Sequence, residues 1–171
     1  YRWFLVNGEL SSLGSKRSLC VIGSCIEMHE QVEREREIWY MANHDTLTGL
    51  PNRNYFETQF SALADECFSS GDGFSVALID INDFTQINDT YGYRMGDGVL
   101  RDFADMLRSY SEYISHVARL SGDEYIVIFK NNLATWSAYE LCQKIIDKCA
   151  TISIQNGERL GLSLSMGLAV F

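Results

Sequence analysis

The sequence predicts an α+β fold in which helices flank a central, mainly antiparallel sheet. Residues 74–80 are a short apolar run, rich in branched side chains, that ends in an acid, as a buried strand does. Residues 116–120 and 125–130 have strand composition and are separated by a Ser-Gly step, which is typical of a hairpin turn. Residues 99–110 carry apolar side chains at helical spacing.

The N-terminal part differs in character from the rest of the chain. Residues 1–10 and 19–28 are expected to form two strands joined by a loop of Ser, Gly, Lys and Arg. These strands resemble the closing strands of a PAS sensor domain, so we interpret residues 1–28 as the C-terminal part of a PAS-like domain. Residues 29–43 are expected to form a helix. It is either a signalling linker that pairs with a copy of itself or a solvated helix that only connects.

Residues 44–171 are expected to form a second domain. Residues 51–53 open a helix, and a later helix is expected from about residue 135 to residue 150. A hairpin is expected around residues 156–158, and the alternating pattern of residues 162–171 predicts a final strand. The elements of this domain are expected in the order β, α, α, β, β, α, β, with the aromatic side chains of the helices in the core.

Carboxylates gather at the ends of the predicted strands. Asp80 ends the first buried strand, and Asp123 and Glu124 follow Gly122 in the hairpin. Adjacent carboxylates repel one another, so their pairing needs a reason. Magnesium supplies one, because it prefers oxygen ligands and usually lies between one or two carboxylates and the phosphates of a substrate. The pattern therefore predicts a magnesium site.

A calcium-binding loop is the alternative for the acids and amides of residues 80–89. Such a loop requires an oxygen ligand at its fifth position and Gly at its sixth. Counted from Asp80, Phe84 and Thr85 occupy these positions, so the calcium interpretation fails.

Four segments of the second domain resemble one known family. Residues 44–53, 80–89, 91–100 and 119–125 look like the ordered signatures of GGDEF domains, the diguanylate cyclases of bacterial cyclic di-GMP signalling. One such motif would be weak evidence, but all of them in order are strong. The resemblance implies a fold like the palm of nucleotidyl cyclases and polymerases. It also implies that a homodimer condenses two GTP molecules into cyclic di-GMP and releases two pyrophosphates.

The resemblance also implies roles for individual residues. Asp80, Asp123 and Glu124 are the expected catalytic residues. Asp80, the Ile81 carbonyl and Asp123 would hold Mg²⁺ or Mn²⁺, and Glu124 would assist the metal site or the proton transfer. The expected GTP contacts are Asn88 and Asp97 for guanine, the backbone N–H groups of Asp83 and Phe84 for the phosphates, and Gly122 for close approach of the hairpin. The alternative is that Asn88, Asp89, Gly92, Gly96 and Asp97 form only an ordered loop.

Several positions depart from the family pattern. Ser121 for the first Gly of the signature, Tyr125 for its last Phe and Asn82 for an Asp are mild changes. Thr85 is more serious, because it replaces a phosphate-contacting Lys, and Tyr93 replaces a usual His. Glu112 and Ser115 occupy the positions of the product-inhibition motif, so feedback inhibition through that site is not expected. Arg119, just before the hairpin, is either a salt-bridge donor or a product contact.

These departures leave more than one function open. The first is an active diguanylate cyclase. The second is an inactive, GTP-binding regulatory module, in a protein that also carries a cyclic di-GMP phosphodiesterase or another signalling domain. Thr85 and Ser121 favour this second function. A third, a dimerising interaction domain without nucleotide, is disfavoured because the acids and Asn88 are retained.

Composition limits the partners and the compartment. A net charge of −9 argues against nucleic acid and anionic membranes as general partners. The five cysteines form no Cys-X-X-Cys pair and are expected to be reduced core thiols, which predicts a cytoplasmic location. A membrane tether outside this chain is compatible with that prediction. Family domains usually continue beyond the last strand with a helix and a strand that bring basic residues, so the C-terminal end of the domain is expected to be missing.

Overall fold

The computed structural model describes residues 1–13, 18–130, 137–150 and 161–171. The chain divides into two compact units, Tyr1–Ala42 and Asn43–Phe171. The hairpin expected around residues 156–158 lies outside the described residues. Within them, no helix is long and apolar enough to cross a membrane.

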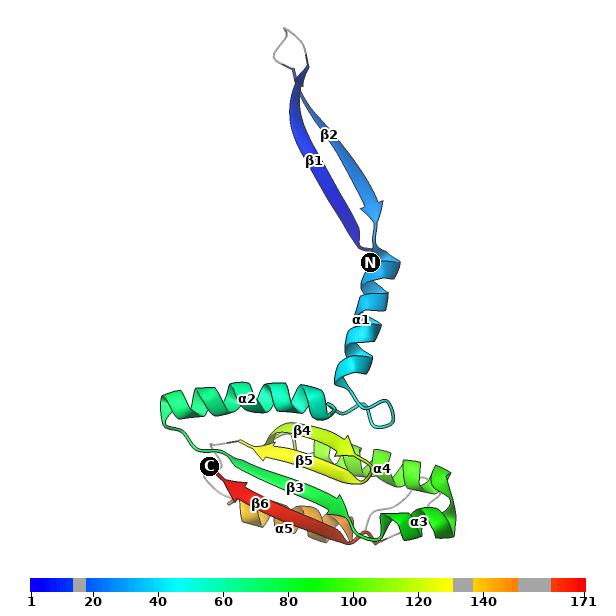
Figure 1. Ribbon diagram of the computed structural model, residues 1–171, viewed down its shortest axis with the longest axis vertical. Coiled ribbons are helices and arrows are strands. Elements are labelled where there is room, and N and C mark those ends of the chain that lie inside the picture. The colour runs from blue at the N-terminus through cyan, green and yellow to red at the C-terminus, as the bar shows by residue number, and fades with distance from the viewer. Residues whose placement is uncertain (14–17, 131–136, 151–160) are drawn as a thin grey trace. The chain divides into compact units, whose positions relative to one another are not determined.

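The first unit consists of a two-stranded hairpin and a helix (Figure 1). Strands β1 (Phe4–Leu13) and β2 (Ser18–Glu27) are antiparallel, and helix α1 (His29–Asn43) has no buried residue. An isolated two-stranded hairpin is only marginally stable in water. The large apolar side chains of this unit that are exposed include Trp3, Phe4, Val6, Ile26, Ile38, Trp39 and Met41. Helix α1 covers the residues expected for a linker helix, and its signalling role stays a prediction.

The second unit is built on an antiparallel sheet with the strand order β4-β5-β3-β6 (Figure 1). The strands are β3 (Ser75–Ile81), β4 (Ile114–Ser121), β5 (Glu124–Phe129) and β6 (Leu164–Val170). Every pair of neighbours is antiparallel. The predicted α+β class with an antiparallel sheet is confirmed.

Helices cover both faces of this sheet. The helices are α2 (Arg53–Ser70), α3 (Phe84–Tyr91), α4 (Tyr93–Arg108) and α5 (Ala138–Cys149). Phe56 of α2 packs in one cluster with Val76 and Ile128. Helices α4 and α5 pack on the opposite face, where Ile79 and Val127 are fully buried. Figure 1 shows α2 on one face and α4 and α5 on the other.

The segment between β3 and α4 is more helical than the sequence indicates. Asn88 lies in α3, and Gly96 and Asp97 lie in α4, so the interpretation of this region as an ordered loop is wrong. Glycine lowers helix propensity, but Gly96 and Gly98 are buried, and tertiary packing overrides a weak local preference. A break remains only at Gly92, whose φ of 83° separates the two helices.

The cysteines are free thiols wherever their side chains are described. Cys67, Cys142 and Cys149 are buried, as expected, whereas Cys25 is exposed, so its assignment to the core is wrong. Strand β2 belongs to a hairpin without a core of its own, which is why this apolar position remains open. Burial raises the pKa of Cys142 to about 11 and that of Cys149 to about 12, so both thiols stay protonated.

Candidate functional site

The antiparallel register brings the predicted catalytic acids together. Asp80, near the end of β3, is paired with Glu124, the first residue of β5, and with Ser165 of β6. Directly paired residues point to the same face of a sheet, so these side chains share a face. Asp123 precedes Glu124 in the hairpin turn. Residues far apart in the sequence therefore meet at one end of the sheet.

This cluster of acids is electrostatically unfavourable without a cation. Burial raises the pKa of Asp80, and the charges of Asp123 and Glu124 raise it further. Within the described part of the chain, neither the Asp80 carboxylate nor the Asp123 carboxylate has a hydrogen-bond partner. Carboxylates held together without donors are suited to bind a cation.

The donor set fits a hard divalent ion that is completed by a substrate. Among the described residues, no three His, Cys, Asp or Glu side chains are arranged to hold a metal by themselves. Asp80 and Asp123 offer carboxylate oxygens, and Ile81, whose side chain is fully buried, can contribute only its backbone carbonyl. Two carboxylates together with phosphates are the usual environment of Mg²⁺, so the residues present fit this ion.

The hairpin turn is formed by Gly122 and Asp123, between the paired residues Ser121 and Glu124. Gly122 has a φ of 47°, and Asp123 does not share this positive φ, which is the pattern of a type II′ turn. A Cβ added at Gly122 would meet nothing within 4 Å. Within the protein, glycine is therefore needed for the turn conformation and not to avoid a clash.

Arg119 fixes the base of this turn. Its Nε and Nη2 donate to the Gly122 carbonyl at 2.9 and 2.7 Å, and its Nη1 donates to Asp45 Oδ1 at 2.8 Å. Only 11% of the Arg119 side chain and 24% of the Asp45 side chain are exposed. Of the two roles that the sequence leaves open for Arg119, the structure supports the salt bridge.

Asp45 is the second partner in this arrangement. Its Oδ1 also accepts hydrogen bonds from the backbone N–H and the hydroxyl of Thr48, at 2.8 and 2.7 Å. Burial acts to raise the pKa of Asp45, but the hydrogen bonds from Thr48 and Arg119 outweigh it and lower the pKa below its usual value. The segment that starts the second unit is thereby attached to the hairpin.

Glu124 has two partners that sequence reasoning missed. The Ser121 hydroxyl donates to Glu124 Oε2 at 2.7 Å, and Nη2 of Arg53 lies 3.8 Å from the same oxygen. The identity of Ser121 was the available signal, because a hydroxyl next to a carboxylate can donate to it. No local pattern indicates Arg53, since it reaches Glu124 only through the packing of α2 on the sheet.

The connection from β3 to α3 is also held by side chains. Asn82 donates to Ser163 Oγ at 2.8 Å and accepts from Ser165 Oγ at 2.6 Å, which joins the end of β3 to β6. Asp83 follows with a left-handed φ of 57°, an uncommon conformation for a residue other than glycine. Asp83 and Phe84 start α3, where backbone N–H groups lack helical partners. Thr85 is exposed beside them.

The predicted guanine contacts lie where α3 packs on α4. A Cβ at Gly96 would collide with the amide oxygen of Asn88. The side chain of Asn88 therefore lies directly over the backbone of Gly96. Asp97 is the residue that follows Gly96 in the sequence. Asn88 and Asp97 are both half-buried. The missing side chain at Gly96 is what allows the Asn88 amide to lie over the backbone of α4.

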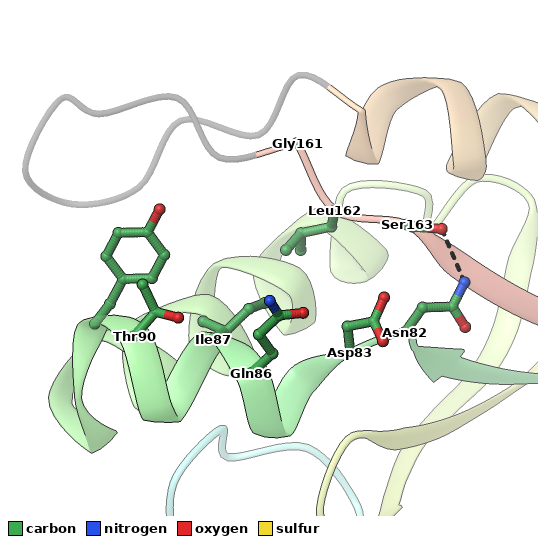
Figure 2. Close-up of a pocket in the computed structure, with 9 residues that line it drawn as sticks. Asn82, Asp83, Gln86, Ile87, Thr90, Gly161, Leu162 and Ser163 are labelled. Atoms are coloured by element: carbon green, nitrogen blue, oxygen red, sulfur yellow. Dashed lines mark hydrogen bonds between the residues drawn. The ribbon is translucent and has the colours of Figure 1, made fainter.

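A pocket of about 310 Å³ lies on another face of α3 (Figure 2). Figure 2 shows Gln86, Ile87 and Thr90 of α3 on one side and Leu162 and Ser163 on the other. Its remaining lining residues are Asn82, Asp83, Tyr91 and Gly161. Of the predicted GTP contacts, only Asp83 belongs to this lining, and Asn88 does not. The pocket is therefore distinct from the position between α3 and α4.

The chain is similar to known signalling enzymes. Residues 42–171 match the family model described as "Diguanylate cyclase, GGDEF domain". The chain is 31% identical over 134 residues to diguanylate cyclase DgcS of Shewanella oneidensis, which covers 78% of this chain and 44% of DgcS. It thus spans less than half the length of that relative.

Solved structures agree with this match. A GGDEF domain of TpbB from Pseudomonas aeruginosa has a TM-score of 0.66 and 33% identity, covering 75% of each chain. The GGDEF domain of DgcB from Caulobacter crescentus, solved with cyclic di-GMP, has a TM-score of 0.65 and 25% identity and covers 76% of this chain and 78% of that one.

Proposed function

Because the chain belongs to the GGDEF family of diguanylate cyclase domains, we propose that it condenses two GTP molecules into cyclic di-GMP and releases two pyrophosphates. The observation that carries the proposal is the meeting of Asp80, Asp123 and Glu124 at one end of the sheet. Such a cluster is suited to a metal-dependent reaction of phosphates.

We assign the metal site to Asp80 and Asp123, the two acids whose carboxylates have no hydrogen-bond partner among the described residues. Asp80, Asp123 and the Ile81 carbonyl would hold Mg²⁺ or Mn²⁺. When bound, the ion polarises the α-phosphate of GTP and lowers the pKa of the attacking ribose hydroxyl. Glu124 assists this site or accepts the proton of that hydroxyl, since Glu124 is paired with Asp80 in the register. Diguanylate cyclases of this family generally use divalent metal ions.

The remaining residues orient the substrate. The carboxylate of Asp97 accepts hydrogen bonds from the guanine N–H groups, and the Asn88 amide offers both a donor and an acceptor. The backbone N–H groups of Asp83 and Phe84 bind the terminal phosphates at the start of α3. A product with twofold symmetry requires two GTP-loaded sites that face each other, so the active species is a homodimer.

Turnover of GTP in the presence of Mg²⁺ tests this function. We expect cyclic di-GMP from the wild-type protein and a loss of about a hundredfold or more in Asp123→Asn. The matched control is Asp72→Asn, which removes an exposed acid that precedes β3, at the end opposite Asp80. Equal turnover in wild type and Asp123→Asn would contradict the proposal.

A second candidate is a regulatory module that binds GTP without turning it over. The observation that favours it is Thr85, which leaves no cation at the position where the family has Lys. In that case GTP binds in a Mg²⁺-dependent manner that requires Asp80, but no product forms. Thr85→Lys should tighten GTP binding by about tenfold to a hundredfold, because a charge-assisted contact is gained. Equilibrium binding of GTP measures this change.

The context of the domain in its parent protein is proposed as well. Residues 1–28 would end a PAS-like sensor domain, residues 29–43 would form the signalling linker, and residues 44–171 would form the GGDEF domain. The parent protein would act in the cytoplasm. The regulatory candidate would act on a phosphodiesterase or another signalling domain of the same protein.

A further inference from the structure

The carboxylate of Glu124 is drawn toward one side of the sheet. In the strand order β4-β5-β3, Glu124 lies between Ser121 of β4 and Asp80 of β3. Its Oε2 accepts the Ser121 hydroxyl at 2.7 Å and lies 3.8 Å from Nη2 of Arg53. Strand β4, which carries Ser121, lies on the other side of β5 from β3, so the hydrogen bond draws the Glu124 carboxylate away from Asp80.

The three carboxylates are therefore not equivalent. Within the described residues, the carboxylates of Asp80 and Asp123 have no hydrogen-bond partner, whereas that of Glu124 has a hydroxyl and a nearby guanidinium. Glu124 is thus partly neutralised by groups other than a metal.

We propose that Ser121 is a positioning residue that withholds Glu124 from the metal, so that Asp80 and Asp123 bind a divalent cation tightly only when nucleotide phosphates complete its ligands. The proposal rests on the proposed function, since it takes the metal site from there. It makes the metal and GTP mutually dependent ligands of this chain. Removal of the Ser121 hydroxyl frees Glu124 to become an additional metal ligand in the absence of nucleotide.

Binding of Mn²⁺ to the full chain without nucleotide tests this coupling, with free Mn²⁺ measured by electron paramagnetic resonance. Ser121→Ala should tighten Mn²⁺ binding by about three- to tenfold, the range expected when one hydrogen bond no longer competes. Ser121→Thr keeps a hydroxyl and should retain the wild-type dissociation constant. Glu124→Gln alone should leave that constant nearly unchanged, and in the Ser121→Ala background it should abolish the gain.

The outcomes separate this inference from its premise. If Asp80→Asn weakens Mn²⁺ binding but Ser121→Ala does not tighten it, the positioning role of Ser121 is wrong. The same conclusion follows if Glu124→Gln alone weakens binding about tenfold, because Glu124 would then already be a ligand. If Asp80→Asn and Asp123→Asn both bind Mn²⁺ like the wild type, the metal site itself is wrong and the proposal falls with it.

Discussion

Asp45 and Asp80 are two aspartates of the same unit with opposite surroundings. Asp45 accepts hydrogen bonds from Thr48 and Arg119, and its pKa is lowered. The carboxylate of Asp80 has no hydrogen-bond partner among the described residues, and its pKa is raised. The ionised carboxylate of Asp45 stabilises the fold, whereas the ionised carboxylate of Asp80 destabilises it. The difference favours a structural role for Asp45, and it leaves the carboxylate of Asp80 available for the metal ion of the proposed function.

Removal of Asp45 should give the largest change in stability. Asp45→Ala leaves the mostly buried guanidinium of Arg119 without its anionic partner. We expect the free energy of unfolding to fall by about 3 kcal/mol. Urea unfolding, followed by circular dichroism, measures this loss. The exposed Asp72→Ala is the control and should differ little from the wild type. A loss no greater than that of the control would show that Asp45 does not stabilise the fold.

The effect of Asp45 should also depend on pH. Because the pKa of Asp45 is lower in the folded state, its stabilisation is fully present above the unfolded pKa of about 3.9. It is lost as the pH falls through the lower folded value. The difference in unfolding free energy between wild type and Asp45→Ala should therefore be constant from pH 7 to about pH 5 and shrink in more acidic buffers. A difference that grows in acid would contradict the assignment.

The hairpin has a second anchor, on the opposite face of the sheet from the acids. Tyr125 is fully buried, packs edge-on against Phe103 at 4.8 Å between ring centroids, and donates its hydroxyl to the Leu100 carbonyl at 2.9 Å. Tyr125→Phe removes only this hydrogen bond and should lower the free energy of unfolding by about 1 kcal/mol. Metal binding should not change, because the acids keep their positions. A change in Mn²⁺ affinity would show that the two faces are coupled.

Removal of Asp80 should have the smallest effect on stability and the opposite sign. Asp80→Asn relieves the repulsion with Asp123 and Glu124, so it should raise the free energy of unfolding by about 0.5 kcal/mol at neutral pH without metal. Because the folded pKa of Asp80 is raised, this gain should disappear as the pH falls below the unfolded pKa. Thermal unfolding with and without Mg²⁺ checks both points. A destabilised Asp80→Asn variant would place Asp80 with Asp45 as a structural acid.

Local sequence was sufficient for the strands that carry the acids. The apolar run before Asp80 and the Ser-Gly step before Asp123 predicted both strand ends, and the register then brought the acids together. The contact of Arg53 with Glu124 could not be predicted from the sequence, because it depends on how α2 packs on the sheet. The bounds of α3 were not predicted, although Phe84, Ile87 and Tyr91 recur at helical spacing, because the polar residues of the same segment match a ligand motif.

The contact between Asn88 and Gly96 makes these two positions one unit for protein engineering. A library that varies residue 88 alone samples only side chains that fit over a bare Cα. Any side chain at residue 96 displaces the amide of Asn88, whatever stands at residue 97. If Asn88 contacts guanine, as proposed, attempts to change the base preference should therefore vary residues 88 and 96 together.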